Sequence, residues 1–473
     1  MRVGAIDQGT TSTRSFVIEA DGTRRVTKAI EHRQNYPQSG WVEHDPEELV
    51  ANIKACIDAA GPLDALGIDN QGESCLAWDA ATGQALSPVI VWQDERTAET
   101  IARLKADGAE DLTLARAGLP LDAYFSAAKL GWIVANLPEA KDALARGSLR
   151  LGTTDAFFAD RLAGRFVTDV STASRTSLMN IATCRWDPDL CALFGVPAEC
   201  LPEIVSNTGE FGTVSTAAGP VPLTALIVDQ QAALYGAGCR APGEAKVTFG
   251  TGAFALMVTG GEIHHEQKHG LLPTVAWRKH GEQTAYALDG GVFTAAAALN
   301  WARGLGLFET FDAIAGFDKP PVIDRGVVFV PALSGLGCPH WDRQARGTWL
   351  GLGLEDGPAD MVQAVLEGVA LRAAEVLYAM ESAVAMQGAV PIDGGLTRNP
   401  YFTGFFADAI DRAVERQDEP EVTAFGTALL AGEAIGAPAP PPASRQRTEP
   451  RGDGVKRREA FSRAVALSRQ WHC

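Results

Sequence analysis

The chain has 473 residues, more than one typical hydrophobic core organises, so we expect two or three domains. Its net charge of −17 argues against nucleic acid or an acidic membrane as the main partner, because both require a basic surface. The sequence contains no run of about 18 apolar residues, so we expect no membrane span. The eight scattered cysteines form no Cys-x-x-Cys pair and indicate free thiols in a reducing cytoplasm, and the first residues resemble a strand rather than a signal peptide.

The first predicted element is a hairpin. Residues 3–6 form an apolar run typical of a buried strand, and residues 15–19 form the second strand. The loop between them holds Asp7, a glycine and hydroxyl residues, which can surround a phosphate with N–H and O–H donors. Asp7 can hold Mg²⁺ through water. The residues alone also allow an ordinary hairpin in which glycine and threonine serve only the turn.

Strands then alternate with helices, which predicts an α/β fold. A third strand is expected near residues 25–32, and a helix over 46–59 with Asp45 as its N-cap and Pro46 at its first position. Further strands are expected at 66–70, 88–92 and 223–228. The first domain is predicted to span residues 1–237.

Asp229 follows the apolar strand at 223–228, where an open sheet exposes its ligands. A carboxylate there could accept a proton from a hydroxyl that attacks a phosphoryl group. The same residue could instead serve only as a helix N-cap, and this pattern alone does not decide between the two.

The second half repeats the opening plan as strand, Gly250-Thr251-Gly252 turn and strand, which predicts a second, similar domain over residues 238–473. A strand at 390–393 leads into Gly394-Gly395, and residues 361–380 predict a long core helix. We expect the folded region to end at the prolines of 438–442. The charged tail, which starts at about residue 437, is expected to carry one surface helix over residues 457–471.

Two common nucleotide motifs, the P-loop and Gly-x-Gly-x-x-Gly, are absent from the sequence. His265-Glu-Gln-Lys-His269 matches the zinc-protease pattern, but Gly270 follows at once and a strand-like run comes next. We therefore expect a loop here rather than a zinc site.

Taken together, these motifs resemble the FGGY carbohydrate kinases, and within them the glycerol kinases. The resemblance runs from residue 3 to about residue 436. It rests on Asp7-Gln-Gly-Thr-Thr-Ser, Gly40-Trp-Val-Glu-His-Asp-Pro, Tyr124-Phe-Ser-x-x-Lys129, Ala173-Ser-Arg-Thr176, Asp229-Gln-Gln-Ala-Ala-Leu, Phe249-Gly-Thr-Gly252, Gly335-Leu-Gly-x-Pro-x-Trp-Asp342 and the segment from Gly347 to Glu367.

The resemblance implies two ribonuclease-H-like domains of the actin/hexokinase type, with ATP and substrate in the cleft between them. It also implies roles for individual residues. Asp7 would position Mg²⁺, and Asp229 would be the general base. ATP would contact Thr10, Thr11, Ser12, Arg14, Gly250, Thr251, Gly394, Gly395 and Asn399. The polyol would contact Glu73, Trp92, Tyr124, Asp229, Gln230 and Phe254.

The chain departs from the glycerol kinase pattern at Gly72, where those enzymes carry an arginine that binds substrate hydroxyls. Losing such a donor could cost about 2–4 kcal/mol, and we expect a void where a longer substrate could fit. Ala296 and Asn300 replace a glycine and a glutamine on the nucleotide-side helix.

The expected activity is ATP-dependent phosphorylation of a small polyol, with glycerol first. A four- or five-carbon polyol or ketose such as erythritol, threitol or xylulose is the alternative, and a catalytically silent ATP-binding sensor is a remote one. The resemblance also implies a homo-oligomer, a dimer or tetramer. The cysteines indicate a cytoplasmic location, and the net charge and the lack of an apolar span argue against a nucleic-acid or membrane partner.

Overall fold

The computed structural model describes residues 1–265, 270–441 and 444–471. Contacts divide the chain into two compact units. Unit 1 comprises Met1–Gly238, Thr274–Tyr286 and Glu421–Pro442, and unit 2 comprises Cys239–Pro273, Ala287–Pro420 and Ala443–Cys473. The first passage between the units follows Gly238, next to the predicted boundary between residues 237 and 238. The division into functional domains at that single boundary stays a prediction.

Unit 1 is built on a six-stranded sheet with the order β13-β14-β5-β1-β2-β3. β1 is parallel to β5 and β5 is parallel to β14, whereas β1–β2 is an antiparallel hairpin. A smaller sheet has the order β4-β7-β6-β8. The strands of unit 1 are β1 Val3–Gln8, β2 Ser12–Ile18, β3 Arg24–Glu31, β4 Glu43–His44, β5 Ala65–Asn70, β6 Cys75–Asp79, β7 Val89–Ile90, β8 Leu149–Thr153, β9 Val167–Asp169, β10 Met179–Asn180, β11 Arg185–Trp186, β12 Glu203–Val205, β13 Thr213–Thr216 and β14 Gly219–Val228.

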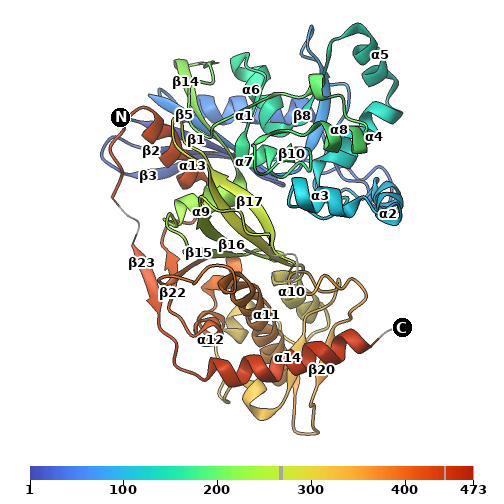
Figure 1. Cartoon of the computed structure of the whole chain (residues 1–473). Helices are drawn as coiled ribbons and strands as arrows, with labels where there is room; N and C mark the ends of the chain where they lie inside the picture. Colours follow the sequence, from blue (N-terminus) through green and yellow to red (C-terminus); the bar gives the residue numbers. More distant parts are fainter. Residues whose placement is uncertain (266–269, 442–443, 472–473) are drawn as a thin grey trace. The chain divides into compact units, whose positions relative to one another are not determined.

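Helices cover both faces of the six-stranded sheet and bury its central strands on both sides. In β5, Leu66 and Ile68 pack in a core with α1 and α6, whereas Gly67 approaches Thr427 of α13. The helices of unit 1 are α1 Pro46–Ala60, α2 Ala98–Ala106, α3 Glu110–Arg116, α4 Ser126–Asn136, α5 Pro138–Arg146, α6 Thr154–Ala163, α7 Val170–Ala173, α8 Pro188–Phe194, η1 Ala198–Cys200, α9 Asp229–Gly236 and α13 Val422–Ala434. Figure 1 shows the orange-red α13 beside the blue β1 and β2, although these segments lie far apart in the sequence.

Glycines allow α9 and α13 to cross closely. A Cβ at Gly426 would lie 1.9 Å from the Ala232 carbonyl oxygen, and one at Gly236 would lie 2.1 Å from the Val422 carbonyl oxygen. The residue that opens α9 is Asp229, so this crossing fixes the helix that carries the predicted base.

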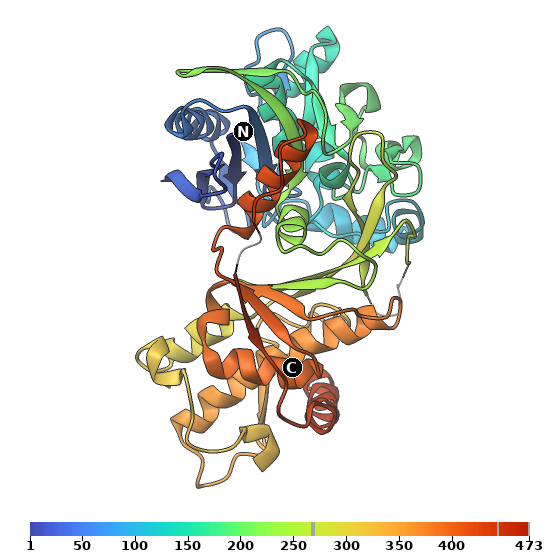
Figure 2. The same ribbon diagram turned by 90° about the vertical axis from the view of Figure 1, so that its left-hand side faces the viewer.

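Unit 2 contains most of a seven-stranded sheet with the order β17-β18-β16-β15-β21-β22-β23. β15–β16 is an antiparallel hairpin and β15 is parallel to β21, which repeats the relation of β1 to β2 and β5. Figure 2 shows the same ribbon from the side. The strands are β15 Ala245–Phe249, β16 Ala253–Gly260, β17 Leu272–Trp277, β18 Ala285–Val292, β19 Val328–Val330, β20 Thr348–Leu350, β21 Val390–Asp393, β22 Val414–Gln417 and β23 Arg445–Thr448. Residues 274–277 of β17 and 285–286 of β18 belong to unit 1.

The core of unit 2 lies between this sheet and its long helices. Phe249 of β15 packs edge-on against Phe402 and Phe406 of α12. The helices are α10 Ala296–Gly304, η3 Phe311–Ile314, η4 Val322–Arg325, α11 Pro358–Glu381, η5 Gly395–Arg398, α12 Pro400–Ile410 and α14 Gly454–Gln470. The α/β class, the helix capped by Asp45 and the long core helix are therefore confirmed.

The expectation that folding ends at the prolines of 438–442 is wrong. β23 pairs with β22 at the edge of the second sheet, and Phe461 of α14 is fully buried in the unit 2 core. β23 contains no apolar residue, so nothing in its own sequence indicated the pairing. No helix within the described residues is long and apolar enough to cross a membrane.

Candidate functional site

Three carboxylates lie at the carboxyl ends of the parallel strands at the centre of unit 1. Asp7 of β1 is in register with Asp69 of β5, and Val228 of β14 is in register with Asn70, so Asp229 comes next at the same edge. Carboxyl ends of parallel strands are where open sheets bind ligands. Sequence reasoning missed Asp69, although an acid ending a buried strand was a visible signal.

Burial in this group favours the protonated carboxyl forms. It raises the pKa of Asp229 to about 7, and the negative charges of Glu73 and Asp7 add to the shift. Burial also raises the pKa of Asp7, against the nearby Arg14 guanidinium, and the pKa of Asp69. Asp229 therefore has the pKa of a base that works near neutral pH.

The carboxylates also fit a magnesium ion. Thr427 donates to one oxygen of Asp69 at 2.7 Å, while the other oxygen is buried without a hydrogen-bond partner in the described part of the chain. Mg²⁺ needs only one or two protein carboxylates when water and phosphate oxygens complete its shell. Within the described residues, no group of three or more His, Cys, Asp or Glu is placed to hold a metal ion without such added ligands.

The predicted phosphate loop lies between β1 and β2. The Gly9 N–H donates to the Ser12 carbonyl at 3.0 Å, which closes the turn. His32 contacts the Thr10 carbonyl at 2.9 Å, and the His32 N–H donates to the Thr11 carbonyl at 3.1 Å. Arg14 lies 3.1 Å from Glu421 and 3.8 Å from Asp7. The loop is thus held through its carbonyls.

Two of the predicted polyol residues contact each other, and one of them, Trp92, also contacts this loop. The Trp92 indole N–H donates to the Thr10 hydroxyl at 3.0 Å, and the Trp92 and Tyr124 rings meet edge to face with centroids 5.6 Å apart. The buried Lys129 donates to the Tyr124 carbonyl at 2.5 Å, and burial lowers its pKa to about 8. Lys129 matched a family segment, but its role under Tyr124 was not foreseen.

Glu73 is buried at 4% exposure and pairs with Arg175, whose Nε donates to its carboxylate at 2.7 Å. Its φ of 60° is unusual for a residue other than glycine. The Ser126 hydroxyl donates to its carbonyl at 2.9 Å. Such a strained, over-determined residue is typical of a functional loop. The Arg175 partner was not predicted, since only folding brings the two segments together.

The void expected beside Gly72 is occupied on one side. A Cβ at Gly72 would lie 2.9 Å from Cγ2 of Val228, and Val228 is itself buried. A methyl group of Val228 therefore lies too close to the position that the Cβ of any side chain at residue 72 would take.

In unit 2, the Gly250-Thr251 turn is held by the start of α10. The Ala295 N–H donates to the Thr251 carbonyl at 2.9 Å, and the Ala296 N–H donates to the Gly250 carbonyl at 3.1 Å. Phe254 lies on β16 in register with Thr248. The turn and Phe254 belong to one hairpin, as the sequence predicted.

The second loop of unit 2 follows β21. Gly394 has a φ of 93°, and a Cβ there would lie 2.1 Å from the Phe249 carbonyl oxygen, so only glycine fits. Gly395 opens η5. The Asn399 side chain caps α12 by accepting from the Phe402 N–H at 2.9 Å, and it donates to the Ile314 carbonyl at 2.8 Å.

Just before this loop, the buried Lys246 pairs with Asp393 at 2.8 Å. The pair joins β15 to β21 beside Gly394. Sequence reasoning missed it because the two residues lie on strands that become neighbours only in the fold.

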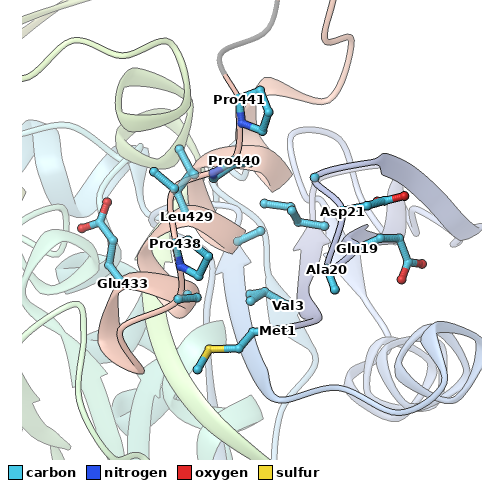
Figure 3. A pocket seen from close by; sticks show the side chains of 16 residues that line it. Met1, Val3, Glu19, Ala20, Asp21, Leu429, Glu433, Pro438, Pro440 and Pro441 are labelled. Carbon is cyan, nitrogen blue, oxygen red and sulfur yellow. The ribbon is translucent and has the colours of Figure 1, made fainter.

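A separate cavity of about 150 Å³ lies in unit 1 where the turn after β2 meets the segment that follows α13 (Figure 3). Its lining includes Met1, Val3, Glu19, Leu429 and Pro438. None of the predicted site residues lines it.

Gln230 lies beside Asp229, and its N–H donates to the Asp229 carboxylate at 2.6 Å.

Comparison with known proteins gives a consistent result over nearly the whole chain. Residues 2–236 match the N-terminal domain and residues 245–435 the C-terminal domain of the FGGY family of carbohydrate kinases. A glycerol kinase of Rhizorhabdus wittichii is 43% identical over 450 residues, 92% of this chain and 88% of that protein. One of Alkalilimnicola ehrlichii is 44% identical over 447 residues, 91% of this chain and 90% of that protein.

Solved structures agree with these sequence relatives. The crystal structure of Plasmodium falciparum glycerol kinase with ADP superposes with a TM-score of 0.92 at 30% identity and covers 99% of this chain and 98% of that one. A xylulose kinase from Brucella ovis gives a TM-score of 0.86 at 25% identity, with the same coverage of both chains. The two-domain α/β fold expected from the resemblance is therefore confirmed.

Proposed function

Because the chain belongs to the FGGY family of carbohydrate kinases, we propose that it transfers the γ-phosphoryl group of ATP to a terminal hydroxyl of glycerol and forms glycerol 3-phosphate. The relatives at 43% and 44% identity are glycerol kinases. The observation that carries the proposal within this chain is Asp229, which ends a parallel strand beside Asp7 and has a pKa of about 7.

In the proposed reaction, the hydroxyl oxygen forms a bond to the γ-phosphorus and the bond to the ADP oxygen breaks. The hydroxyl proton passes to the Asp229 carboxylate, which is ionised above its pKa of about 7. Gln230 holds the same carboxylate through its backbone N–H. In this scheme Asp229 is the only protein group that takes a proton.

The phosphates would contact donors from two loops, Thr10, Thr11, Ser12 and Arg14 in one and Gly250 and Thr251 in the other. The adenosine would contact Gly394, Gly395 and Asn399. Asn399 already uses both ends of its amide, so we propose that it shapes this loop and contributes to binding through its backbone. Phosphoryl transfer depends mostly on such positioning.

Asp7, with Asp69 next to it, would hold Mg²⁺. When bound, the ion neutralises negative charge on the phosphate oxygens. Arg14 bridges Asp7 and Glu421 and keeps the carboxylate at the loop.

The polyol would lie against Trp92, Tyr124 and Phe254, with its hydroxyls bonded to Glu73, Gln230 and Asp229. The hydrogen bond from Trp92 to Thr10 supports this assignment, because it places a proposed polyol-binding residue in contact with the proposed phosphate loop. Arg175 would keep the Glu73 carboxylate oriented.

A substrate panel tests the proposal. ADP release is measured with glycerol, erythritol, threitol, xylitol and xylulose in the presence of Mg²⁺ and ATP. We expect glycerol to give the highest kcat/KM. Glycerol as the poorest substrate of the panel would reject it, and no turnover with any polyol would reject the kinase proposal.

A four- or five-carbon polyol or ketose is the second candidate. Its support is the absence of a guanidinium at position 72, where Val228 presents a methyl group instead. The likeness to the Brucella ovis xylulose kinase also favours it. A catalytically silent ATP-binding sensor is a remote candidate, and it predicts ADP binding without turnover in the same panel.

We further propose a cytoplasmic location and a homo-oligomer, either a dimer or a tetramer. The free cysteines in the described part of the chain support the first. The exposed Leu352 and fully exposed Leu354 of unit 2 offer apolar surface for the second. Sedimentation of purified protein measures the oligomeric state.

A further inference from the structure

A polar pocket of about 410 Å³ lies within unit 2, away from the loops assigned above to the phosphates. It is bounded by η5, by one face of α12, by β22 and by the edge strand β23, and Figure 1 shows these two strands side by side. Its lining is Thr397, Arg398, Pro400, Thr403, Gly404, Asp408, Arg416, Gln446, Arg447, Thr448, Glu449 and Arg451. We call it the arginine pocket.

Four arginines face two carboxylates in this lining, and both carboxylates are already engaged. Glu449 pairs with Arg447 at 2.6 Å. Asp408 pairs with Arg457 at 2.9 Å and accepts from the N–H groups of Arg451 and Gly452. These bonds neutralise the two acids locally.

Three arginines keep an uncompensated charge. Arg416 donates to the neutral amide oxygen of Gln446 at 2.6 Å. Among the described residues, no carboxylate forms an ion pair with Arg398, Arg416 or Arg451. These three arginines therefore form a locally positive site on a chain whose net charge is −17.

The shape of the pocket leaves these charges open to a ligand. A Cβ at Gly404 would have no atom within 4 Å, so the α12 side of the pocket is unfilled. The first turn of α12, an 11-residue helix that begins at Pro400, adds the positive end of its dipole. Guanidinium groups bind phosphate oxygens with paired hydrogen bonds.

We propose that the arginine pocket binds a small phosphate-bearing anion, either inorganic pyrophosphate or a phosphate monoester, through Arg398, Arg416 and Arg451. The pocket shares η5 with the loop assigned to adenosine, since Thr397 and Arg398 line it while Gly395 and Asn399 flank them. An anion bound there changes ADP affinity, and ADP changes anion affinity by the same factor. This coupling rests on the proposed function, whereas anion binding does not.

Calorimetric titration of the full chain with pyrophosphate, inorganic phosphate and glucose 6-phosphate tests the site. We expect a dissociation constant in the millimolar range or below for at least one probe. Arg398→Gln/Arg451→Gln should weaken it at least tenfold. Arg463→Gln is the matched control, because Arg463 is exposed on α14 of the same unit and outside the pocket lining.

A second variant guards against indirect effects. Gly404→Asp places a carboxylate in the unfilled space and should also weaken binding at least tenfold. Pyrophosphate binding better than glucose 6-phosphate identifies an inorganic polyanion as the ligand type, and the reverse identifies an ester. Binding that is equal in the wild type and both pocket variants, or absent at 10 mM of every probe, overturns the proposal.

Discussion

The two units hold their candidate residues by different means. In unit 1 the chemistry rests on buried charged side chains: Asp7, Asp69 and Asp229 lie at one sheet edge, and Glu73 pairs with Arg175. In unit 2 it rests on backbone shape, with Gly394 packed against the Phe249 carbonyl and the Gly250-Thr251 turn held through its carbonyls.

Substitutions in the two units should therefore affect activity and stability differently. A charged residue in unit 1 that is costly to bury can be replaced with a loss of activity and a gain in stability. A glycine in unit 2 that is required by its backbone cannot be replaced without losing local structure. The predictions below test this contrast.

Asp229→Asn should have the largest effect, a loss of kcat of about 10³-fold or more, because no other group takes the proton. At pH 8 its melting temperature should equal or exceed that of the wild type. A rise in pKa from 3.8 to about 7 corresponds at most to about 4 kcal/mol of lost stability when the carboxyl is ionised. A fall in stability together with normal turnover would break the contrast.

Arg175→Gln should lower kcat/KM for the best polyol by roughly 100-fold, because it leaves Glu73 buried without its cation. Arg175→Lys keeps the charge and should recover part of the loss. The polyol KM separates a positioning role from a merely structural one, and a folded variant with an unchanged polyol KM would contradict the assignment.

Gly394→Ala should weaken ADP binding at least tenfold and lower the melting temperature, because its Cβ would meet the Phe249 carbonyl at 2.1 Å. Gly395→Ala is the matched control for stability, since a Cβ there meets nothing within 4 Å. Equal melting temperatures for the two variants would mean that backbone shape does not govern unit 2.

The smallest effect is expected at Gly72. Gly72→Arg alone should destabilise the chain, because its Cβ meets Val228. Gly72→Arg/Val228→Ala should recover stability and lower the glycerol KM about tenfold, as one charged hydrogen bond allows. Val228→Ala alone is the control. Additive effects of the two substitutions would show that Val228 does not limit the size of the side chain that position 72 can hold.

Local patterns predicted much of this molecule. Apolar runs and turn glycines indicated the hairpins β1–β2 and β15–β16, and Asp45 with Pro46 predicted the start of α1. These features depend on neighbouring residues, so the sequence alone carries them.

Features that depend on the fold were missed. The partnership of Asp69 with Asp7 arises from parallel register, and the pairs Glu73–Arg175 and Lys246–Asp393 join segments far apart in the chain. The approach of Val228 to Gly72 was also missed, because it is visible only in three dimensions.

We propose that Asp229 is the base of a polyol kinase. The pH dependence of kcat/KM for the best polyol, at saturating ATP and Mg²⁺, is the decisive measurement for this role. Because the reactive form is the carboxylate and its pKa is about 7, the rate should rise with pH to a plateau, with an apparent pKa near 7. The stability that this group contributes should fall as the pH rises from about 4 to about 7, since the folded state keeps its proton to a higher pH than the unfolded state. A rate that is flat from pH 5.5 to 8.5 would contradict the claim.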